Sequence, residues 1–388
     1  MKIYRIVGIG LRLLWLTILV GFQAGFSNLG ALEAGDQCPE FSLEASDGIT
    51  YSSKDFIGKV PVVIAWFPKA FTGGCTRECQ SFQDASRALD QFDVLYFAAS
   101  VDGVDKNREF AESLGVSFPI LSDPFKLASS AFGVTDEEQP LARRWTFFVG
   151  ADGFIRHVDR SINVSDAGKD VAERMASLGF PKKSQTANSL ADSEKAVGWR
   201  LLFDGRDTSR WMTELRNPTR APVEDQAILA SGSGGGMVLH ADSFSNFELS
   251  VDIRMESEFS NSGIFIRLSD LHDPFPNSFE VQVVGAGGQG YSAFGSVLDL
   301  APSSTSSFDP RAWNNLRIRA DGPTITTWVN MKKAAMLDTS LFTESGLRPD
   351  GSRHKYGIVR DMPHTGFMGF QDLDSKVWYR NIKIRELP

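Results

Sequence analysis

The chain has 388 residues, which is long for a single core and favours two domains. Apolar residues make up 42% and charged residues 23% of it, as is ordinary for a globular protein. The formal net charge is −8 and the basic residues are scattered, which argues against nucleic acid as a partner.

The beginning of the chain has the pattern of an export signal. Lys2, Arg5 and Arg12 precede an apolar stretch over residues 13–22, and small and polar residues follow it. The stretch is short for a membrane span, although an uncleaved anchor is the alternative. We therefore expect residues 1–32 to be a signal peptide and the mature protein to be periplasmic or extracellular, where thiols can be oxidised. Contact with a membrane is expected only if the signal stays uncleaved.

Residues 33–181 alternate between strand-like and helix-like segments. The apolar run over residues 60–67 is typical of a central strand that is buried on both faces. The elements expected after it are a helix over 76–89, a strand over 92–100, a helix over 106–114, two strands within 146–158 and a helix over 166–178. This alternation predicts an α/β domain.

The segment "PKAFTGGCTREC" (68–79) carries the chemistry expected of this domain. Only a thiolate is a strong nucleophile, and free N–H groups at a helix start favour an anion such as that of Cys75. Thr72 can turn its hydroxyl towards the same point, and Pro68 can close the loop against water. Arg143 and Arg144 precede the strand "TFFV" and could bring a guanidinium to the same pocket.

Three segments in order resemble the peroxiredoxin family, in particular its bacterioferritin-comigratory branch, with its thioredoxin-like fold. They are "PKAFTGGC", "FPILSDPFKLASSAFGV" and "RWTFFVGADGFIRHV", and "AGDQCPEFSLEASDG" resembles the family's first strand region. The resemblance covers about residues 33–181. It implies that Cys75 is the peroxidatic cysteine, that Thr72 and Pro68 are its loop partners and that Arg144 stabilises the thiolate and the peroxide. It also implies a peroxide substrate, no cofactor, and an external dithiol of the thioredoxin type as reductant.

The second cysteine departs from that branch, which usually has its resolving cysteine five residues after the first, whereas Cys79 is four residues after Cys75. Residues four apart on a helix have Cβ atoms about 5–6 Å apart, while a disulfide requires about 3.8 Å. We expect Cys79 to be the resolving cysteine, with local unwinding of the helix. A structural disulfide and a copper site with a third ligand such as His157 are the alternatives. Cys38 is expected to be a packed residue.

Residues 182–197 are polar and predict a linker, and residues 198–388 show no helical periodicity. In "FELSVDIRM", Phe247, Leu249 and Val251 alternate with polar residues, as in a strand with one buried face. The same alternation recurs over residues 279–283, 314–320, 325–330 and 377–387. Many such strands separated by Gly, Pro, Asp and Ser turns predict a β-sandwich.

Six segments in order resemble the 3-keto-disaccharide hydrolase domain, a jelly roll related to the concanavalin and laminarinase sandwiches. They are "GWRLLFDGRDTSRW", "NSGIFIR", "FEVQV", "LDLAPSS", "WNNLRIRADGPTITTWVN" and "GFMGFQDLDSKVWYRNIKIREL". The resemblance covers about residues 198–388 and implies that an oligosaccharide or glycoside is the ligand. Leu373 and Met331 stand where the family commonly has His and Gly, which weakens the catalytic interpretation.

A carboxylate could remove the acidified C2 proton of a 3-keto sugar and expel the C1 substituent, after which water adds. Glu280 and Gln282 are expected to point away from the sandwich core onto a concave face. The further candidates are Arg267 for the keto oxygen, Asp299 or Asp372 as a second carboxylate, and Trp328 or Trp378 for stacking on a sugar ring. Sugar binding without turnover and a purely structural module are the alternatives. No metal site is predicted, and a metal in the sandwich is left open.

The sequence as a whole predicts an exported peroxidase joined to a sandwich that engages carbohydrate. The rival hypothesis makes the sandwich the functional centre and the redoxin domain an accessory module.

Overall fold

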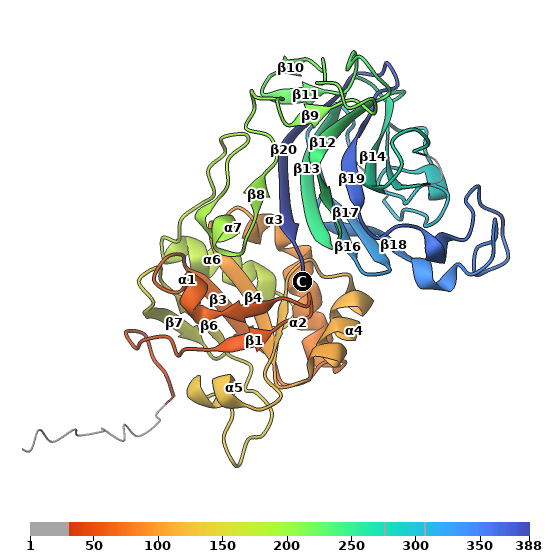
Figure 1. The fold of residues 1–388 in the computed structure, drawn as a ribbon. Coiled ribbons are helices and arrows are strands. Elements are labelled where there is room, and N and C mark those ends of the chain that lie inside the picture. Colours follow the sequence, from red (N-terminus) through yellow and green to blue (C-terminus); the bar gives the residue numbers. More distant parts are fainter. Residues whose placement is uncertain (1–30, 275–276, 306–307) are drawn as a thin grey trace, which may run out of the picture.

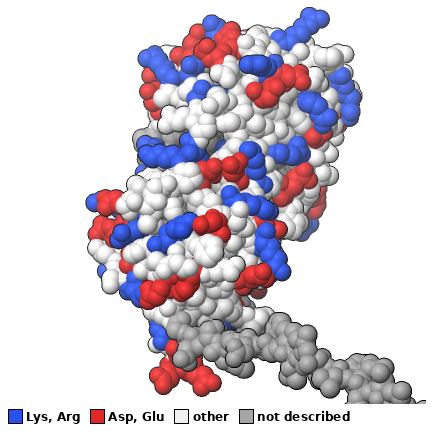
Figure 2. All heavy atoms as spheres, turned by 90° about the vertical axis from the view of Figure 1, so that its left-hand side faces the viewer, with Lys and Arg blue, Asp and Glu red and all other residues white. Residues whose placement is uncertain are grey.

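The computed structural model describes residues 31–274, 277–305 and 308–388, which form two domains stacked on one another (Figure 1). The predicted signal peptide lies outside the described residues, apart from its last two positions. Within the described ranges, no helix is both long and apolar enough to cross a membrane. Lysines, arginines and carboxylates are intermixed over the face of both domains in Figure 2, in keeping with the scattered basic residues of the sequence.

The N-terminal domain is the predicted α/β domain. Its elements are β1 (Ser42–Glu44), β2 (Thr50–Ser52), α1 (Ser53–Phe56), β3 (Val62–Trp66), α2 (Gly73–Asp84), α3 (Ser86–Leu89), β4 (Leu95–Ser100), α4 (Val104–Leu114), β5 (Ile120–Ser122), α5 (Leu127–Ala131), β6 (Thr146–Val149), β7 (Ile155–Asp159) and α6 (Ala167–Ser177). The sheet has the order β5-β4-β3-β6-β7, in which β3, β4 and β5 are parallel and β6 and β7 run antiparallel to their neighbours. All five residues of the central strand β3 are buried, because structure covers both faces of the sheet.

Helix α2 starts earlier and ends earlier than the sequence predicts. Gly73 and Gly74 join its first turn, and Thr72 is the extended N-cap residue, with φ −98° and ψ 148°. Ala85, with φ −85° and ψ 1°, separates α2 from α3, so the predicted helix over 76–89 is two helices. Helix α6 packs directly on α2 at Gly168, where a Cβ atom would lie only 2.4 Å from the Ser81 carbonyl oxygen.

The segment predicted to be a linker is packed on the N-terminal domain. It contains helix α7 (Asp192–Ala196), whose first N–H groups donate to the Asp93 carboxylate, from Ser193 at 2.7 Å. Lys183 is ion-paired with Asp90 at 2.6 Å. The polar composition therefore reflects ion pairing. The segment also contacts the sandwich, where Lys383 donates to the Glu194 carboxylate at 2.5 Å.

The C-terminal domain is the predicted all-β sandwich, with its main core between two sheets. Its strands are β8 (Arg200–Leu201), β9 (Trp211–Met212), β10 (Val223–Glu224), β11 (Ala227–Leu229), β12 (Met237–Phe244), β13 (Phe247–Met255), β14 (Asn261–Leu268), β15 (Phe279–Val284), β16 (Asn314–Asp321), β17 (Thr324–Val329), β18 (Lys332–Asp338), β19 (Gly366–Gln371) and β20 (Val377–Glu386). Three short 3-10 helices are η1 (Gly290–Ser292), η2 (Thr339–Leu341) and η3 (Val359–Asp361). The larger sheet has the order β10-β11-β20-β13-β16-β17-β18, with β8 paired to β20, and the smaller has the order β15-β14-β19-β12-β9.

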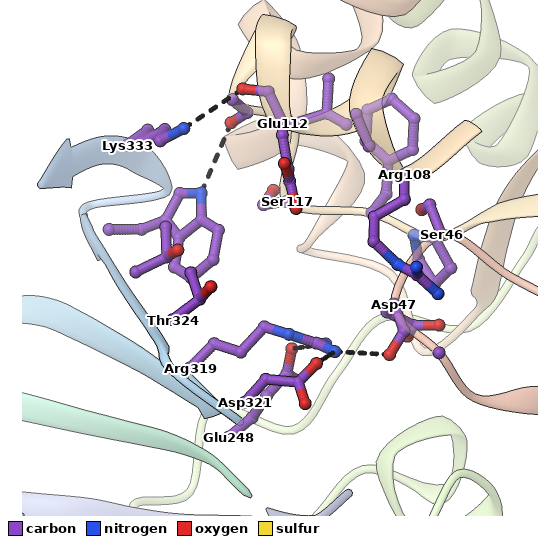
Figure 3. Close-up of a pocket in the computed structure, with 18 of the residues that line it drawn as sticks. Ser46, Asp47, Arg108, Glu112, Ser117, Glu248, Arg319, Asp321, Thr324 and Lys333 are labelled. Carbon is purple, nitrogen blue, oxygen red and sulfur yellow. Dashed lines mark hydrogen bonds and ion pairs between the residues drawn. The ribbon is translucent and has the colours of Figure 1, made fainter. Parts of the chain in front are cut away.

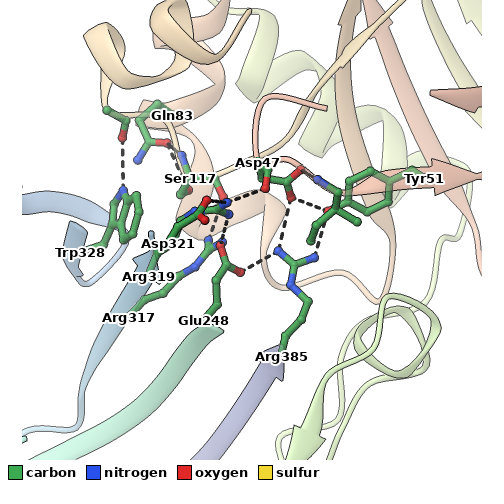
Figure 4. Close-up of polar contacts among 12 residues, drawn as sticks. Asp47, Tyr51, Gln83, Ser117, Glu248, Arg317, Arg319, Asp321, Trp328 and Arg385 are labelled. Carbon is green, nitrogen blue, oxygen red and sulfur yellow. Dashed lines mark hydrogen bonds and ion pairs between the residues drawn. The ribbon is translucent and has the colours of Figure 1, made fainter. Parts of the chain in front are cut away.

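The domains meet at the outer face of the larger sheet, where the polar residues of β13, β16 and β20 point away from the core. Arg317 donates to the Ser117 carbonyl oxygen at 2.8 Å, and Arg385 donates to the Tyr51 hydroxyl at 2.9 Å (Figure 4). The polar half of the strand alternation therefore faces a protein surface and not solvent.

Glu248 is the centre of this interface. Its buried carboxylate accepts hydrogen bonds from Arg317, Arg319 and Arg385 at 2.8, 3.1 and 2.7 Å (Figure 4). Burial alone would raise the pKa of Glu248, but Arg317, Arg385 and Arg319 outweigh burial and hold that pKa below its usual range. Arg319 also donates to the Asp47 carbonyl oxygen at 2.5 Å, so the charged cluster is shared by both domains.

Candidate active site

The first candidate site lies at the carboxyl end of β3, where the chain turns into α2. Phe71 adopts a left-handed backbone conformation, with φ 63°, and its ring packs edge-on against Phe110 at 5.1 Å between centroids. The Ala70 N–H donates to the Asp102 carboxylate at 2.7 Å. Backbone strain of this kind persists only where the surroundings hold it, so the loop is fixed from two sides. It delivers Cys75 as the third residue of α2, with 1% of its surface exposed.

Arg144 reaches Cys75 because of the sheet topology. Strand β6 runs antiparallel to β3, so the residues just before β6 lie at the end of β3 where α2 begins. Arg144 donates from Nη2 to the Cys75 Sγ at 3.4 Å, and from Nη1 to the Glu78 carboxylate. Arg143 instead pairs with Asp136 at 2.6 Å. Of the two arginines considered from the sequence, the structure therefore places Arg144 at the thiol.

Glu78 belongs to this site and was missed in the sequence. It is 1% exposed, and burial raises its pKa to about 7 although Arg144 opposes the shift. Glu78 could have been predicted from the sequence, because it is three residues after Cys75 and residues three apart share a helix face. A glutamate on the buried face of a helix needs a partner, and Arg144 is that partner.

Thr72 and Pro68 flank the same loop at its two ends. The Thr72 hydroxyl donates to the Lys69 carbonyl oxygen at 2.9 Å and its side chain is exposed, whereas Pro68 is half-buried. Thr72 is thus the N-cap residue of α2, three residues before Cys75, and its hydroxyl proton is directed back into the loop.

Cys79 lies one turn along α2 and is 0% exposed. It packs in one apolar cluster with Cys75, Phe67, Phe110 and Val116. Burial, together with the charges of Glu78 and Cys75, raises the pKa of the Cys79 thiol well above its ordinary value.

The three cysteines are unpaired thiols, so no structural disulfide is present in this state. Cys38 packs in the other half of the core, and burial raises its pKa to about 12, as expected of an inert packed thiol. His157 lies on β7 against the ring of Phe148. In the part of the chain that the structure describes, no three His, Cys, Asp or Glu side chains are grouped to hold a metal ion.

The second candidate site lies on the outer face of the smaller sheet. Glu280 and Gln282 point away from the core, as predicted, but they are covered and not open to solvent, with Glu280 3% exposed. The Glu280 side chain lies over Gly263. A Cβ atom at position 263 would come within 2.3 Å of the Glu280 Oε1, so only glycine leaves room for this carboxylate. Burial raises the pKa of Glu280 to about 7, with Lys355 opposing the shift. Its Oε2 has no hydrogen-bond partner among the described residues.

Asp299 lies in the same region. The Leu298 N–H donates to the Glu280 carbonyl oxygen at 2.8 Å, and the Asp299 carboxylate accepts from Arg348 at 2.6 Å and from the Lys355 N–H at 2.7 Å. Burial, then the charges of Glu280 and Asp299, raise the pKa of Tyr356, so these groups converge. We call this set, which sequence reasoning found only in part, the Glu280 cluster: Glu280, Asp299, Arg348, Lys355 and Tyr356.

Arg267 and Asp372 have structural roles, which corrects the predictions made for them. Arg267 is fully buried and donates to the carbonyl oxygens of Ser245 at 3.1 Å and Gly322 at 2.7 Å. Asp372 accepts from the Ser233 hydroxyl at 2.7 Å. Their polar atoms are thus engaged in fixing turns.

The two tryptophans also lie away from the Glu280 cluster, because β17 and β20 belong to the other sheet. Trp378 donates to Glu224 at 3.0 Å and lies under Arg254, 4.8 Å from ring centroid to guanidinium. Trp328 donates to the Gly115 carbonyl oxygen at 3.4 Å and is buried between the domains (Figure 4). Stacking of either tryptophan on a sugar ring therefore stays a prediction, and such stacking would occur away from Glu280.

Trp328 lines a cavity of about 490 Å³ between the domains (Figure 3). The N-terminal domain contributes Arg108 and Glu112 to its wall, and the sandwich contributes Thr324 and Lys333. Lys333 donates to the Glu112 carbonyl oxygen at 3.2 Å across it. The cavity is thus a crevice of the domain interface, bridged by hydrogen bonds.

A buried cysteine at a helix start, bridged by arginine to glutamate on a thioredoxin-like fold, defines a thiol peroxidase domain, here joined to a β-sandwich. The family model of AhpC/TSA proteins matches residues 34–158. Peroxiredoxin Bcp of Escherichia coli is 34% identical over 136 residues, which are 34% of this chain and 86% of that protein. The chain belongs to the peroxiredoxin family, with relatives of the Bcp type.

The sandwich is matched by the family model of the 3-keto-alpha-glucoside-1,2-lyase-like domain, over residues 198–385. Two solved structures are similar as well. Peroxidoxin BcpB of Mycobacterium tuberculosis is 29% identical, with 38% of this chain and 97% of that chain covered and a TM-score of 0.35. A protein of Parabacteroides distasonis described as a glycosyl hydrolase is 27% identical, with 49% and 99% covered and a TM-score of 0.41.

Proposed function

We propose that this peroxiredoxin reduces hydrogen peroxide or organic hydroperoxides through Cys75. The Cys75 thiolate attacks one peroxide oxygen, the O–O bond breaks, and the departing oxygen leaves as water or an alcohol after taking up a proton. Cys75 is then a sulfenic acid. The observation that carries the proposal is the Arg144 guanidinium, which donates to the Cys75 Sγ at the N-terminus of α2. It supplies a permanent positive charge where the thiolate forms and where the peroxide must bind.

The second step that we propose is condensation of the sulfenic acid with Cys79. A Cys75–Cys79 disulfide forms and water leaves, after which an external dithiol of the thioredoxin type restores both thiols. Both cysteines are in α2, so the first turn of that helix has to unwind before the two sulfur atoms meet.

Two cysteine variants test these roles, because they predict opposite defects. Cys75→Ser should consume no peroxide even in the first turnover. Cys79→Ser should consume one equivalent at near the wild-type rate, keep a sulfenic acid that dimedone traps, and then lose recycling. Excess peroxide should then oxidise the Cys75 sulfenic acid of this variant to the sulfinic acid. Cys38→Ser, the control, should behave as wild type. Peptide mass spectrometry of the oxidised wild type identifies the bridge, and a Cys38–Cys75 or intermolecular bridge would refute the role of Cys79.

A second activity is proposed for the sandwich, on the evidence of the Glu280 cluster. Glu280 has a buried carboxylate oxygen without a hydrogen-bond partner among the described residues, and its pKa is raised to about 7 by burial. Such a group suits proton removal from C2 of a 3-keto sugar. Glu280→Gln should then abolish turnover of a 3-keto glycoside and preserve binding, while Trp378→Ala on the other sheet should not change turnover. Glycan binding without release of aglycone by the wild type would instead support a binding domain.

Export is the third part of the proposal, based on the basic residues and apolar stretch at the start of the chain. Fractionation of cells that express the full chain, with N-terminal sequencing of the product, tests it. A protein recovered from the cytoplasm with an intact N-terminus would contradict export.

A further inference from the structure

Glu78 lies between the two reactive cysteines on α2, three residues after Cys75 and directly before Cys79. One of its carboxylate oxygens is bound by Arg144. The other, Oε1, is buried and has no hydrogen-bond partner among the described residues. Buried carboxylate oxygens are normally hydrogen-bonded, so this oxygen needs an explanation that the pairing with Arg144 does not give.

Closing the disulfide requires that the Cys79 thiol lose its proton. The attacking sulfur has to be a thiolate, yet Cys79 is fully buried, and burial raises the pKa of its thiol well above the ordinary value. Solvent therefore does not readily take this proton while α2 is folded. The charged and titratable groups that influence the pKa of Cys79 are Glu78 and Cys75 on α2 and Arg144 before β6. Tyr96 of β4 has a buried hydroxyl, whose pKa is in turn raised by burial and by Cys79 and Glu78.

Of these four groups, only the carboxylate can accept the proton. Arg144 carries its own positive charge, Cys75 is already a sulfenic acid at this stage, and burial raises the pKa of Tyr96 so that it stays protonated. Burial raises the pKa of Glu78 to about 7. A group that titrates near the working pH can both accept and return a proton.

We propose that Glu78 carries the proton in the disulfide-forming step. Its carboxylate takes the proton from Cys79, the Cys79 thiolate attacks the sulfur of the Cys75 sulfenic acid, and the S–O bond breaks. The departing hydroxide takes the proton back from Glu78 and leaves as water. One S–S and one O–H bond form, one S–H and one S–O bond break, and Glu78 ends as it began. The proposal rests on the roles of Cys75 and Cys79 proposed above.

Glu78→Gln in the full-length chain tests this role, because an amide oxygen can still accept the hydrogen bond of Arg144 but cannot take a proton. Rapid-quench trapping with dimedone follows sulfenic acid formation and disulfide closure as separate rates. We expect closure to slow about 100-fold or more, and sulfenic acid formation to slow about tenfold at most. The wild-type closure rate should rise with pH through about 7 and then level off. In Glu78→Gln this inflection should vanish, and Glu78→Asp should restore it in part. Tyr96→Phe, the matched control, should keep the inflection.

Equal slowing of both steps in Glu78→Gln would reduce Glu78 to a residue that positions Arg144, and closure at the wild-type rate would overturn the proposal outright. If that variant does not fold, the wild-type profile decides, and closure with no inflection between about pH 5.5 and 8.5 overturns it. Failure of the proposed function is visible separately, as a wild type that never forms a Cys75–Cys79 bridge.

Discussion

Arg144 is the residue on which the peroxidase site depends, because one planar guanidinium contacts both the Cys75 sulfur and the Glu78 carboxylate. A forked donor can hold two partners in a fixed geometry, which an ammonium group cannot. The neighbouring Arg143 has the same charge but is directed to Asp136. The contact, and not the net charge of the segment, distinguishes the two.

Arg144→Ala should slow the first-turnover consumption of peroxide by about 100-fold or more, because a donor to the developing charge is lost. Arg143→Ala should change that rate by less than about threefold, and Arg144→Lys should recover only part of it. Stopped-flow measurement of single turnovers gives the three rates. If the two alanine variants lose the first-turnover rate to a similar extent, Arg144 has no specific role at the thiol.

Glu280 makes the stability of the sandwich depend on pH. Its folded pKa, about 7, lies above the ordinary value of 4.5 because of burial, so folding takes up a proton between these values. The stabilising contribution is therefore fully present below about pH 4.5 and is lost as the pH rises through about 7. It amounts to roughly 3 kcal/mol by the usual conversion of pKa shifts.

Glu280→Gln should flatten this dependence, so that the variant gains stability relative to wild type at pH 8 but not at pH 4.5. Urea unfolding of both proteins across this range measures the difference. The exposed Glu256→Gln is the control and should follow the wild type. An unchanged slope in Glu280→Gln would mean that Glu280 is not buried as a carboxyl group.

At the scale of the element, the last turn of α2 is anchored by hydrogen bonds to the sandwich and to other elements of its own domain. Gln83 donates to the Met331 carbonyl oxygen of the sandwich at 2.5 Å and accepts from the Ser117 N–H at 2.9 Å. The Gly168 N–H of α6 donates to the Ser81 hydroxyl at 3.1 Å. These contacts all fall after Cys79. Unwinding can thus be confined to the turn that contains the two cysteines, while the rest of the helix keeps its packing.

Oxidation should accordingly increase amide exchange over about residues 75–80 and leave residues 81–84 protected, because the anchored part of α2 need not move. Hydrogen exchange with mass spectrometry of reduced and peroxide-treated protein measures this. Cys79→Ser treated in the same way should keep the pattern of the reduced state. Loss of protection along the whole of α2 would show that the anchors give way on closure.

At the scale of the whole molecule, the interface joins the domains through charge and not through an apolar surface. Glu248 holds three arginines of its own domain in place, and each of them contacts the N-terminal domain (Figure 4). Arg317 donates to Ser117, Arg319 donates to Asp47, and Arg385 donates to Tyr51 and contacts the Asp47 carboxylate at 3.5 Å. These contacts favour one arrangement of the domains, because a shift between the domains would take the arginines away from their partners in the N-terminal domain.

Glu248→Ala should lower stability by about 3–5 kcal/mol, since it leaves the three arginines buried without their carboxylate. We expect separate unfolding of the two domains in calorimetry and a larger radius of gyration in solution scattering. Glu386→Ala, an exposed glutamate on β20, is the control and should change neither measurement. A single unchanged transition in Glu248→Ala would show that the remaining contacts suffice to hold the domains.

Local patterns in the sequence determined the class of each domain. The apolar run of β3 and the alternation of Phe247, Leu249 and Val251 depend on which face of each strand is buried. Residues that are close in the sequence show this pattern, so it can be recognised without the structure. Cys75 at a helix start was readable for the same reason, because the Thr-Gly-Gly before it and the helix after it are adjacent in the chain.

Only the tertiary structure decided which distant residues meet. Arg144 reaches Cys75 across 69 positions because β6 lies antiparallel to β3, and the sequence alone could not choose between Arg144 and Arg143 by charge. Alternation showed that Trp328 points out of its sheet, but not that the other domain covers that face. Arg267 looked like a ligand-binding cation because its carbonyl partners come from turns 22 and 55 residues away. Periodicity predicts on which face of an element a side chain lies. Predicting a site also requires knowledge of what packs on that face, and only the tertiary structure supplies it.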